Sequence, residues 1–206
     1  PLNHAKEAPT TGAWQFTNAI DSWSWQGYEG EKAVVEVYAN SASVRLLLNG
    51  KEIANKPVKK YKTLFKLPYQ PGTLTAEALD ERGNVISSHS LTTAGEETVL
   101  RVTPDKMVLC ANNQALCYLP IEFTDKAGNL KPYMEQRVEV AVAGAATLAG
   151  FGSALCKTNE VFDKPYHHSY RGRCLAVLRA GSTPGKAKVT VTSAGMEPVT
   201  IEVEVQ

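Results

Sequence analysis

The stretch Val44-Arg45-Leu46-Leu47-Leu48-Asn49-Gly50-Lys51 decides the fold of the first half of the chain. The strand-forming residues 44–48 are followed there by the dipeptide Asn49-Gly50. This dipeptide is a strong hairpin signal, because a type I′ turn needs positive φ at both central positions. Short runs of Val, Thr, Leu and Tyr, separated by Gly, Pro and Asn, recur along the rest of the chain, and helical periodicity is nearly absent. The sequence therefore predicts an all-β protein.

The expected strands follow from this alternation of apolar and polar residues. In the segment 186–192, for example, Ala187, Val189 and Val191 point to one face of a sheet and the residues between them to the other. The strands expected on this basis are 33–39, 43–48, 61–67, 73–79 and 85–92 in the first half, and about 116–124, 137–142, 175–179, 187–192 and 199–205 in the second.

Two local motifs occur once in each half and indicate that the halves are built alike. Asp80-Glu81-Arg82-Gly83-Asn84 matches Asp125-Lys126-Ala127-Gly128-Asn129, a turn whose glycine can adopt the left-handed conformation before the next strand. Pro71-Gly72 and Pro184-Gly185 likewise precede alternating strands. The repetition predicts two domains of the same kind.

The domain boundaries follow from strand spacing. Turns every 8 to 12 residues are typical of antiparallel sandwiches of about 100 residues, and two such domains use up the chain. We expect two tandem immunoglobulin-like antiparallel β-sandwiches, covering 14–95 and 96–206, after a linker or tail at 1–13. The small, polar segment 92–97 is the natural junction.

The positive and negative charges of the chain nearly cancel, which argues against nucleic acid or a membrane as a partner. The 206 residues carry 22 Lys+Arg against 21 Asp+Glu, a formal net charge of +1, and each half is close to neutral. No basic face for nucleic acid and no polybasic patch for a membrane is expected. No apolar run approaches the roughly 18 residues needed to span a bilayer. Because the chain begins at Pro1, we expect a fragment or a processed chain, and its first residues carry no argument about localisation.

The four cysteines, Cys110, Cys117, Cys156 and Cys174, all lie in the second half and form no C-x-x-C pair. Zinc-ribbon and thioredoxin sites are therefore excluded. A disulfide between Cys110 and Cys117 stays open, and the competing interpretation is that these are separate thiols in strands. His167 and His168 lie near cysteines in the sequence but lack the spacing of metal ligands, so neither a metal nor a cofactor is expected.

An aromatic cluster, Trp14, Trp23, Trp25 and Tyr28, is the most unusual feature of the first half. Exposed indole or phenol rings here would offer a face on which a sugar ring can stack, which makes these residues candidate carbohydrate contacts. The competing interpretation is structural, since large aromatic side chains contribute most to burial. The core interpretation is favoured for Trp25, and the two are closely balanced for Trp14 and Trp23.

A polar and aromatic loop in the second half is the other candidate site. Tyr166, His167, His168, Tyr170 and Arg171 follow one another closely in a segment without strand alternation. Such loops carry function more often than regular elements do. The expectation is contact with a partner domain or with a ligand at the edge of a cleft.

Catalytic motifs are absent from the sequence. No G-x-S-x-G elbow, P-loop or G-x-G-x-x-G occurs. A glycosidase needs two carboxylates about 5 to 9.5 Å apart, and no pair here can be assigned that geometry. No residue of this chain is predicted to be catalytic.

Several motifs, in order, resemble a known family. Ser22–Gly30, Val35–Asn40 and Val44–Lys51 resemble the domain that follows the catalytic barrel in bacterial family 2 glycoside hydrolases of the β-galactosidase type. The second half resembles the C-terminal domain of those enzymes. The residues that carry this second resemblance are Leu116–Leu119, Gly150–Ser153, Tyr170–Val177 and Thr192–Met196. Two departures are Ile20-Asp21-Ser22, where the family usually has His before the Trp, and Ala154-Leu155-Cys156, where many members have an acidic residue and Pro.

The resemblance implies a function for a longer parent enzyme. The parent would hydrolyse terminal β-galactosides, or related β-glycosides, with two Glu residues of a (β/α)₈ barrel, and a barrel needs about 250 residues that are not present here. This chain would be a non-catalytic accessory region that supports the barrel and shapes the substrate cleft. Its partners would be the barrel and N-terminal domains of the parent chain, and further copies in a homo-oligomer. Export to the periplasm or the medium is implied by the resemblance alone.

Two other hypotheses remain. One domain would bind carbohydrate on its aromatic residues, or the pair of sandwiches would act as an adhesive or spacer module. Fold alone does not separate them.

Overall fold

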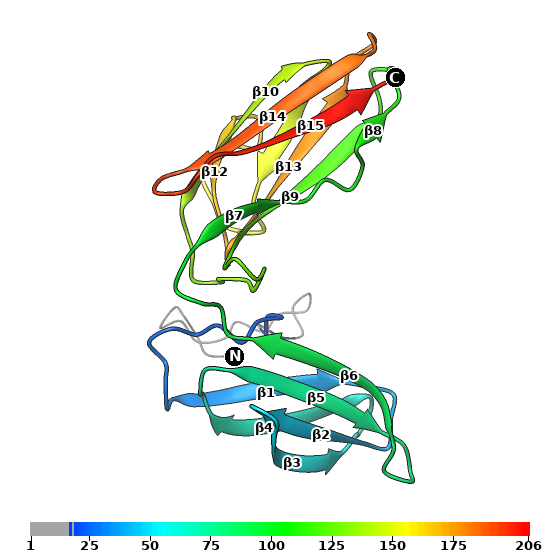
Figure 1. The fold of residues 1–206 in the computed structure, drawn as a ribbon, viewed down its shortest axis with the longest axis vertical. Coiled ribbons are helices and arrows are strands. Elements are labelled where there is room, and N and C mark those ends of the chain that lie inside the picture. Colours follow the sequence, from blue (N-terminus) through cyan, green and yellow to red (C-terminus); the bar gives the residue numbers. More distant parts are fainter. Residues whose placement is uncertain (1–16, 18) are drawn as a thin grey trace. The chain divides into compact units, whose positions relative to one another are not determined.

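The computed structural model describes residues 17 and 19–206, and its regular elements are the strands β1 to β15. The described residues contain no helix, so none could cross a membrane. The prediction of an all-β fold made of antiparallel sandwiches is confirmed. The chain folds into two compact units, the first ending at Ala94 and the second beginning at Gly95, here called unit 1 and unit 2 (Figure 1).

Unit 1 consists of two sheets. Strands β1 and β4 pair antiparallel in one sheet, and the other has the order β3-β2-β5-β6 (Figure 1). The burial pattern of β2 alternates strictly, because every second side chain points to the facing sheet. The strand bounds are Lys32–Tyr38 (β1), Ser43–Leu48 (β2), Lys51–Pro57 (β3), Lys62–Pro68 (β4), Thr73–Leu79 (β5) and Val85–Thr92 (β6).

The Asn-Gly turn joins β2 to β3 as predicted. Asn49 has φ of 53° and Gly50 has φ of 78°, the two positive values that a type I′ turn requires. The strand that follows, β3, was not expected from the sequence. Its burial pattern is almost wholly exposed, because it lies at the edge of its sheet and has few apolar residues to mark it.

Unit 2 also contains two sheets, with the orders β12-β10-β14-β15-β8 and β11-β13-β9-β7. All pairs are antiparallel except β8 with β15, which is parallel. The inward side chains of both sheets form one continuous core that includes Leu119, Phe123 and Val189. The strand bounds are Val99–Val102 (β7), Val108–Leu109 (β8), Leu116–Thr124 (β9), Arg137–Gly144 (β10), Ala146–Gly152 (β11), Tyr166–His168 (β12), Arg173–Ala180 (β13), Gly185–Ser193 (β14) and Val199–Val205 (β15).

The five-residue turn motif has the same structure in both units. In each copy the aspartate carboxylate accepts hydrogen bonds from the backbone and the side chain of the asparagine four residues later: Asp80 from Asn84, and Asp125 from Asn129. Gly83 and Gly128 have φ of 83° and 90°. The prediction of left-handed glycines at these turns is therefore confirmed.

The four cysteines are free thiols. Cys117 lies inside the core of unit 2, and its thiol donates a hydrogen bond to the carbonyl oxygen of Lys106 at 3.2 Å. Cys110 is exposed. The structure therefore shows Cys110 and Cys117 as separate thiols and not as a disulfide.

Candidate functional site

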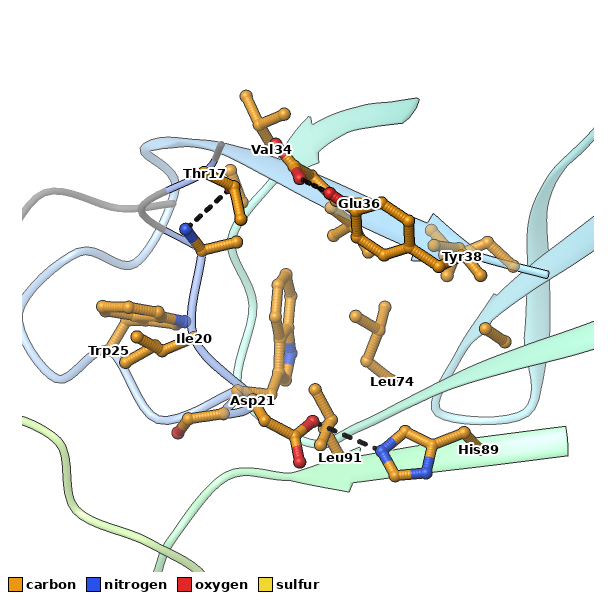
Figure 2. A pocket seen from close by; sticks show the side chains of 18 residues that line it. Thr17, Ile20, Asp21, Trp25, Val34, Glu36, Tyr38, Leu74, His89 and Leu91 are labelled. Atoms are coloured by element: carbon orange, nitrogen blue, oxygen red, sulfur yellow. Dashed lines mark hydrogen bonds and ion pairs between the residues drawn. The ribbon is translucent and has the colours of Figure 1, made fainter. Parts of the chain in front are cut away.

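A cavity of about 400 Å³ lies in unit 1 between the edge of β1, strands β5 and β6, and the segment that precedes β1 (Figure 2). Apolar side chains form its floor, and polar side chains stand only at its rim. The residues that line the floor are Ile20, Trp23, Trp25, Ala33, Val35, Val37, Leu46, Leu74, Ala76 and Leu91.

Two of the predicted aromatic contacts are buried at this cavity. Trp23 and Trp25 are only 3% and 5% exposed and belong to the core cluster of unit 1. The Trp23 indole donates a hydrogen bond to the carbonyl of Gln70 at 2.9 Å, and its ring meets that of Tyr69 edge to face, with centroids 5.1 Å apart. Neither indole lies on an open surface on which a sugar could stack. This burial favours the core interpretation of both.

The side chain of Tyr69 holds the backbone of the segment 23–25 by hydrogen bonds. This side chain is fully buried, and its hydroxyl donates to the carbonyl of Trp23 at 3.3 Å and accepts from the amide of Trp25 at 3.2 Å. The hydroxyl of Thr93 donates to the same Trp23 carbonyl at 2.7 Å. The residues that anchor this segment therefore come from far along the sequence, where no local pattern marks them.

The other two aromatic candidates differ. Tyr28 is half-buried and packs against the core of unit 1. Trp14 lies outside the described residues.

The rim of the cavity carries two carboxylates, both with partners. Asp21 lies 3.3 Å from Nε2 of His89, and Figure 2 shows these two side chains pointing toward each other. Glu36 pairs with the ammonium of Lys62 at 2.9 Å and accepts a hydrogen bond from the hydroxyl of Tyr38 at 2.7 Å. Burial pushes the pKa of Glu36 upward, but the hydrogen bonds and charge of these partners outweigh it and hold the pKa below its usual value. Glu36 is therefore ionised at neutral pH.

In unit 2, two residues of the predicted loop, His167 and His168, contact Glu160, which the sequence analysis did not single out. Glu160 lies 3.2 Å from Nδ1 of His167 and 2.8 Å from Nδ1 of His168, and it also accepts a hydrogen bond from the backbone amide of His168. These hydrogen bonds, with the nearby imidazoles, keep the pKa of Glu160 below its usual value although burial raises it. Glu160 thus fastens the irregular segment after β11 to β12.

His167 is fully buried, in contrast to the surface loop expected from the sequence. Its ring stacks on Phe162, with centroids 5.6 Å apart, and meets Phe151 edge to face. Its Nε2 has no hydrogen-bond partner. The reason for its burial is that β12 pairs with β10, which turns every second residue of β12 inward.

Of the remaining residues of that loop, Tyr166 and His168 are exposed, and Tyr170 and Arg171 are half-buried. The guanidinium of Arg137 covers the ring of Tyr166 at 4.0 Å, and Arg171 lies over the ring of Tyr170 at 5.2 Å. The structure therefore brings together Glu160, His167 and His168, and it leaves Tyr170 and Arg171 in a separate turn.

A second cavity, of about 490 Å³, lies beside this cluster in unit 2. Phe162 and Leu175 form its exposed walls, and Gly150 and Gly152 its floor. A side chain at Gly152 would collide with the ring of Phe162, so the glycine lets that ring lie flat on β11. No carboxylate lines this cavity. Within the described part of the chain, no group of three or more potential ligands is arranged to hold a metal ion.

Two known protein-family models match parts of this chain. Residues 100–202 match the family model described as glycoside hydrolase family 2 C-terminal domain 5, and residues 30–87 match a domain of unknown function (DUF4982). The chain is 29% identical over 195 residues to β-galactosidase BoGH2A of Bacteroides ovatus, covering 93% of this chain and 23% of that protein.

Solved structures agree with this assignment. A glycosyl hydrolase family 2 member from Bacteroides cellulosilyticus matches with a TM-score of 0.89 and 27% identity, over 100% of this chain and 27% of the other. A β-glycosidase from Bacteroides vulgatus, at 23% identity, matches in fold with a TM-score of 0.83, over 90% of this chain and 24% of the other. The chain spans about a quarter of the length of the relatives that it matches. It belongs to glycoside hydrolase family 2, and its second half is that family's C-terminal domain 5.

Proposed function

We propose that this chain is a non-catalytic accessory region of a longer, β-galactosidase-like family 2 glycoside hydrolase. The parent enzyme hydrolyses terminal β-galactosides or related β-glycosides. The two units, with domain limits at 14–95 and 96–206, support its catalytic barrel and shape one side of the substrate cleft. The observation that carries the proposal is that nearly the whole chain matches only about a quarter of each glycosidase.

The chemistry of the two cavities supports a role without catalysis. A glycosidase needs one carboxylic acid with a raised pKa to protonate the leaving group, and a second carboxylate across the sugar. At the cavity of unit 1, the pKa of Glu36 is lowered and Asp21 is held by His89. The cavity of unit 2 has no carboxylate in its lining. Glu36 therefore lacks the raised pKa that the acid of the reaction requires, and the cavity of unit 2 lacks the carboxylate itself.

The exposed apolar residues of unit 2 support a docking role. Phe162 and Leu175, which line the cavity of unit 2, are 56% and 41% exposed, and Val161, next to Phe162 in the sequence, is 52% exposed. Exposed apolar side chains at a cavity are typical of an interface with another domain. The proposed occupant is the remainder of the parent chain, and the neighbouring loop with Tyr166, His168, Tyr170 and Arg171 would lie at the margin of that contact.

A hydrolysis assay tests this proposal. The purified 206-residue chain is incubated with a chromogenic β-galactoside, and a β-galactosidase of the family is the positive control. We expect no turnover above the buffer rate. Turnover that survives repurification would overturn the proposal, since the chain would then contain its own catalytic groups.

A further inference from the structure

The segment from Lys51 to Lys66, here called the lysine-rich segment, runs from β3 through a tight turn at 59–62 into β4 of the other sheet. It contains six lysines and one acidic residue, Glu52, although the whole chain has a net charge of only +1. We propose that the turn at 59–62, with the outer face of the β1–β4 sheet, is a binding site for an anionic polysaccharide.

The lysines of this segment are available to a ligand. Lys62 pairs with Glu36, and Lys56 donates a hydrogen bond to the carbonyl of Leu64 at 2.9 Å. The other four are exposed, and none has a carboxylate within ion-pair distance among the residues that the structure describes: Lys51, Lys59, Lys60 and Lys66. Lys59 and Lys60 lie in the turn and Lys66 lies in β4, whereas Lys51 lies at the far end of β3 and is not part of the proposed site. A ligand that brings negative charge would therefore find cations that need not first leave another partner.

The turn at 59–62 has an unusual sequence for its geometry. Lys59 and Lys62 exchange two backbone hydrogen bonds of 3.1 Å, so that Lys60 and Tyr61 are the two central residues. Their φ values are 51° and 62°, and such left-handed positions favour asparagine and glycine. The other type I′ turn of unit 1 uses Asn49-Gly50. Strained backbone of this kind often occurs at ligand sites, which favours a functional reason for the Lys-Tyr pair.

Two exposed aromatic rings lie at the same end of the β1–β4 sheet. Tyr61 is 69% exposed and Tyr38 is 60% exposed. Tyr38 is directly opposite Lys62 in the strand register, and the Lys62 ammonium lies 5.2 Å from the centre of its ring. The amide of Ala39 donates to the carbonyl of Tyr61, which ties the turn to the end of β1. Phenol rings and ammonium groups are thus combined on one surface.

This combination fits a sugar polymer that bears carboxylate or sulfate groups. Aromatic faces offer apolar surface to the rings, and lysines bind anions as point charges. Lysines bind phosphate as well as carboxylate or sulfate, so a poly(dT) oligonucleotide is included in the test as the competing polyanion. The choice of a polysaccharide also rests on the proposed function, because the parent would act on carbohydrate.

A double substitution, Lys60→Asn with Tyr61→Gly, separates binding from folding. It replaces the strained pair by the preferred residues, so the melting temperature of the chain should rise or stay unchanged. Binding of the full 206-residue chain to polygalacturonate should weaken at least about tenfold. Binding by the unaltered chain should also weaken several-fold when NaCl is raised from about 50 to about 200 mM, and neutral galactan should not bind.

The matched control is Lys188→Asn in β14, which removes one positive charge from an exposed residue of unit 2. This variant should bind polygalacturonate as the unaltered chain does. Equal weakening in both variants would overturn the proposal, as would the absence of polygalacturonate binding, or tighter binding to a poly(dT) oligonucleotide of equal charge. None of these results would bear on the accessory role, which the hydrolysis assay tests separately.

Discussion

The buried hydroxyl of Tyr69 donates a hydrogen bond to the backbone carbonyl of Trp23, 46 residues earlier in the chain, at 3.3 Å. The same hydroxyl accepts a hydrogen bond from the amide of Trp25. The Tyr69 side chain therefore ties the segment that enters unit 1 to the end of β4 at two backbone groups. Both tryptophans belong to the core of unit 1.

Replacing Tyr69 by Phe should destabilise unit 1 by about 1 to 3 kcal/mol, because the buried amide of Trp25 loses its acceptor, while the carbonyl of Trp23 keeps the hydroxyl of Thr93. Urea unfolding followed by tryptophan fluorescence measures the loss. The matched control is Tyr38→Phe, which removes an exposed hydroxyl bonded to Glu36 and should cost less than about 1 kcal/mol. Equal effects of the two variants would show that the buried hydroxyl has no special role.

Lys131, a buried lysine, should contribute to the stability of unit 2. It is 1% exposed, and its ammonium donates to the carbonyl of Glu96 at 2.7 Å and to the hydroxyl of Thr98 at 2.9 Å. Lys131→Met leaves both acceptors without this donor, so unit 2 should lose about 1 to 3 kcal/mol in urea unfolding. Lys126→Met, at an exposed lysine, should change the stability by less than about 0.5 kcal/mol. If Lys131→Met proved neutral or stabilising, the polar contacts of its ammonium would contribute nothing net.

Acid should destabilise unit 2 partly through Asp125. Burial raises the pKa of this carboxyl, but hydrogen bonds from Asn129 and from the amide of Gly95 outweigh it, so the pKa lies below its usual value. A carboxyl whose pKa is lowered by folding stabilises the protein above its unfolded pKa of about 4, and this contribution is lost as pH falls through the lower folded value.

The melting temperature of Asp125→Asn should therefore fall less steeply than that of the unaltered chain between about pH 5 and about pH 2. Asp163→Asn, at an exposed carboxyl, serves as the control and should keep the original slope. Identical slopes in all three proteins would contradict the role assigned to Asp125.

The two exposed cysteines should react with a thiol reagent faster than the two buried ones. Burial, aided by the charge of Glu160, raises the pKa of Cys174 to about 12, and burial also raises the pKa of Cys117. At about pH 8 a disulfide reagent should label the exposed Cys110 and Cys156 quickly, and the other two only when denaturant is added. Mass mapping of the labelled peptides identifies the sites. Rapid labelling of Cys174 in the native chain would show that its surroundings open readily.

The strands with strong alternation could be predicted from the sequence, and the partners of the site residues could not. Strands β2, β5, β9 and β15 begin and end where the alternation predicts, and β6 has its predicted bounds although nearly all its side chains are exposed. By contrast, β3 is too polar to be recognised, and β12 is too short. The burial of His167 and its contact with Glu160 depend on the pairing of β12 with β10 and on the irregular segment before it, neither of which leaves a periodic signal.

The central claim is that this chain belongs to a longer hydrolase and has no catalytic activity of its own. An antibody raised against the 206-residue chain, used to precipitate the native protein from the cells that produce it, tests this most directly. We predict a band several times larger than 22.3 kDa and a precipitate that hydrolyses a chromogenic β-galactoside or a related β-glycoside, while the purified 206-residue chain does not. A single native band at 22.3 kDa, or hydrolysis by the purified chain, would contradict the account.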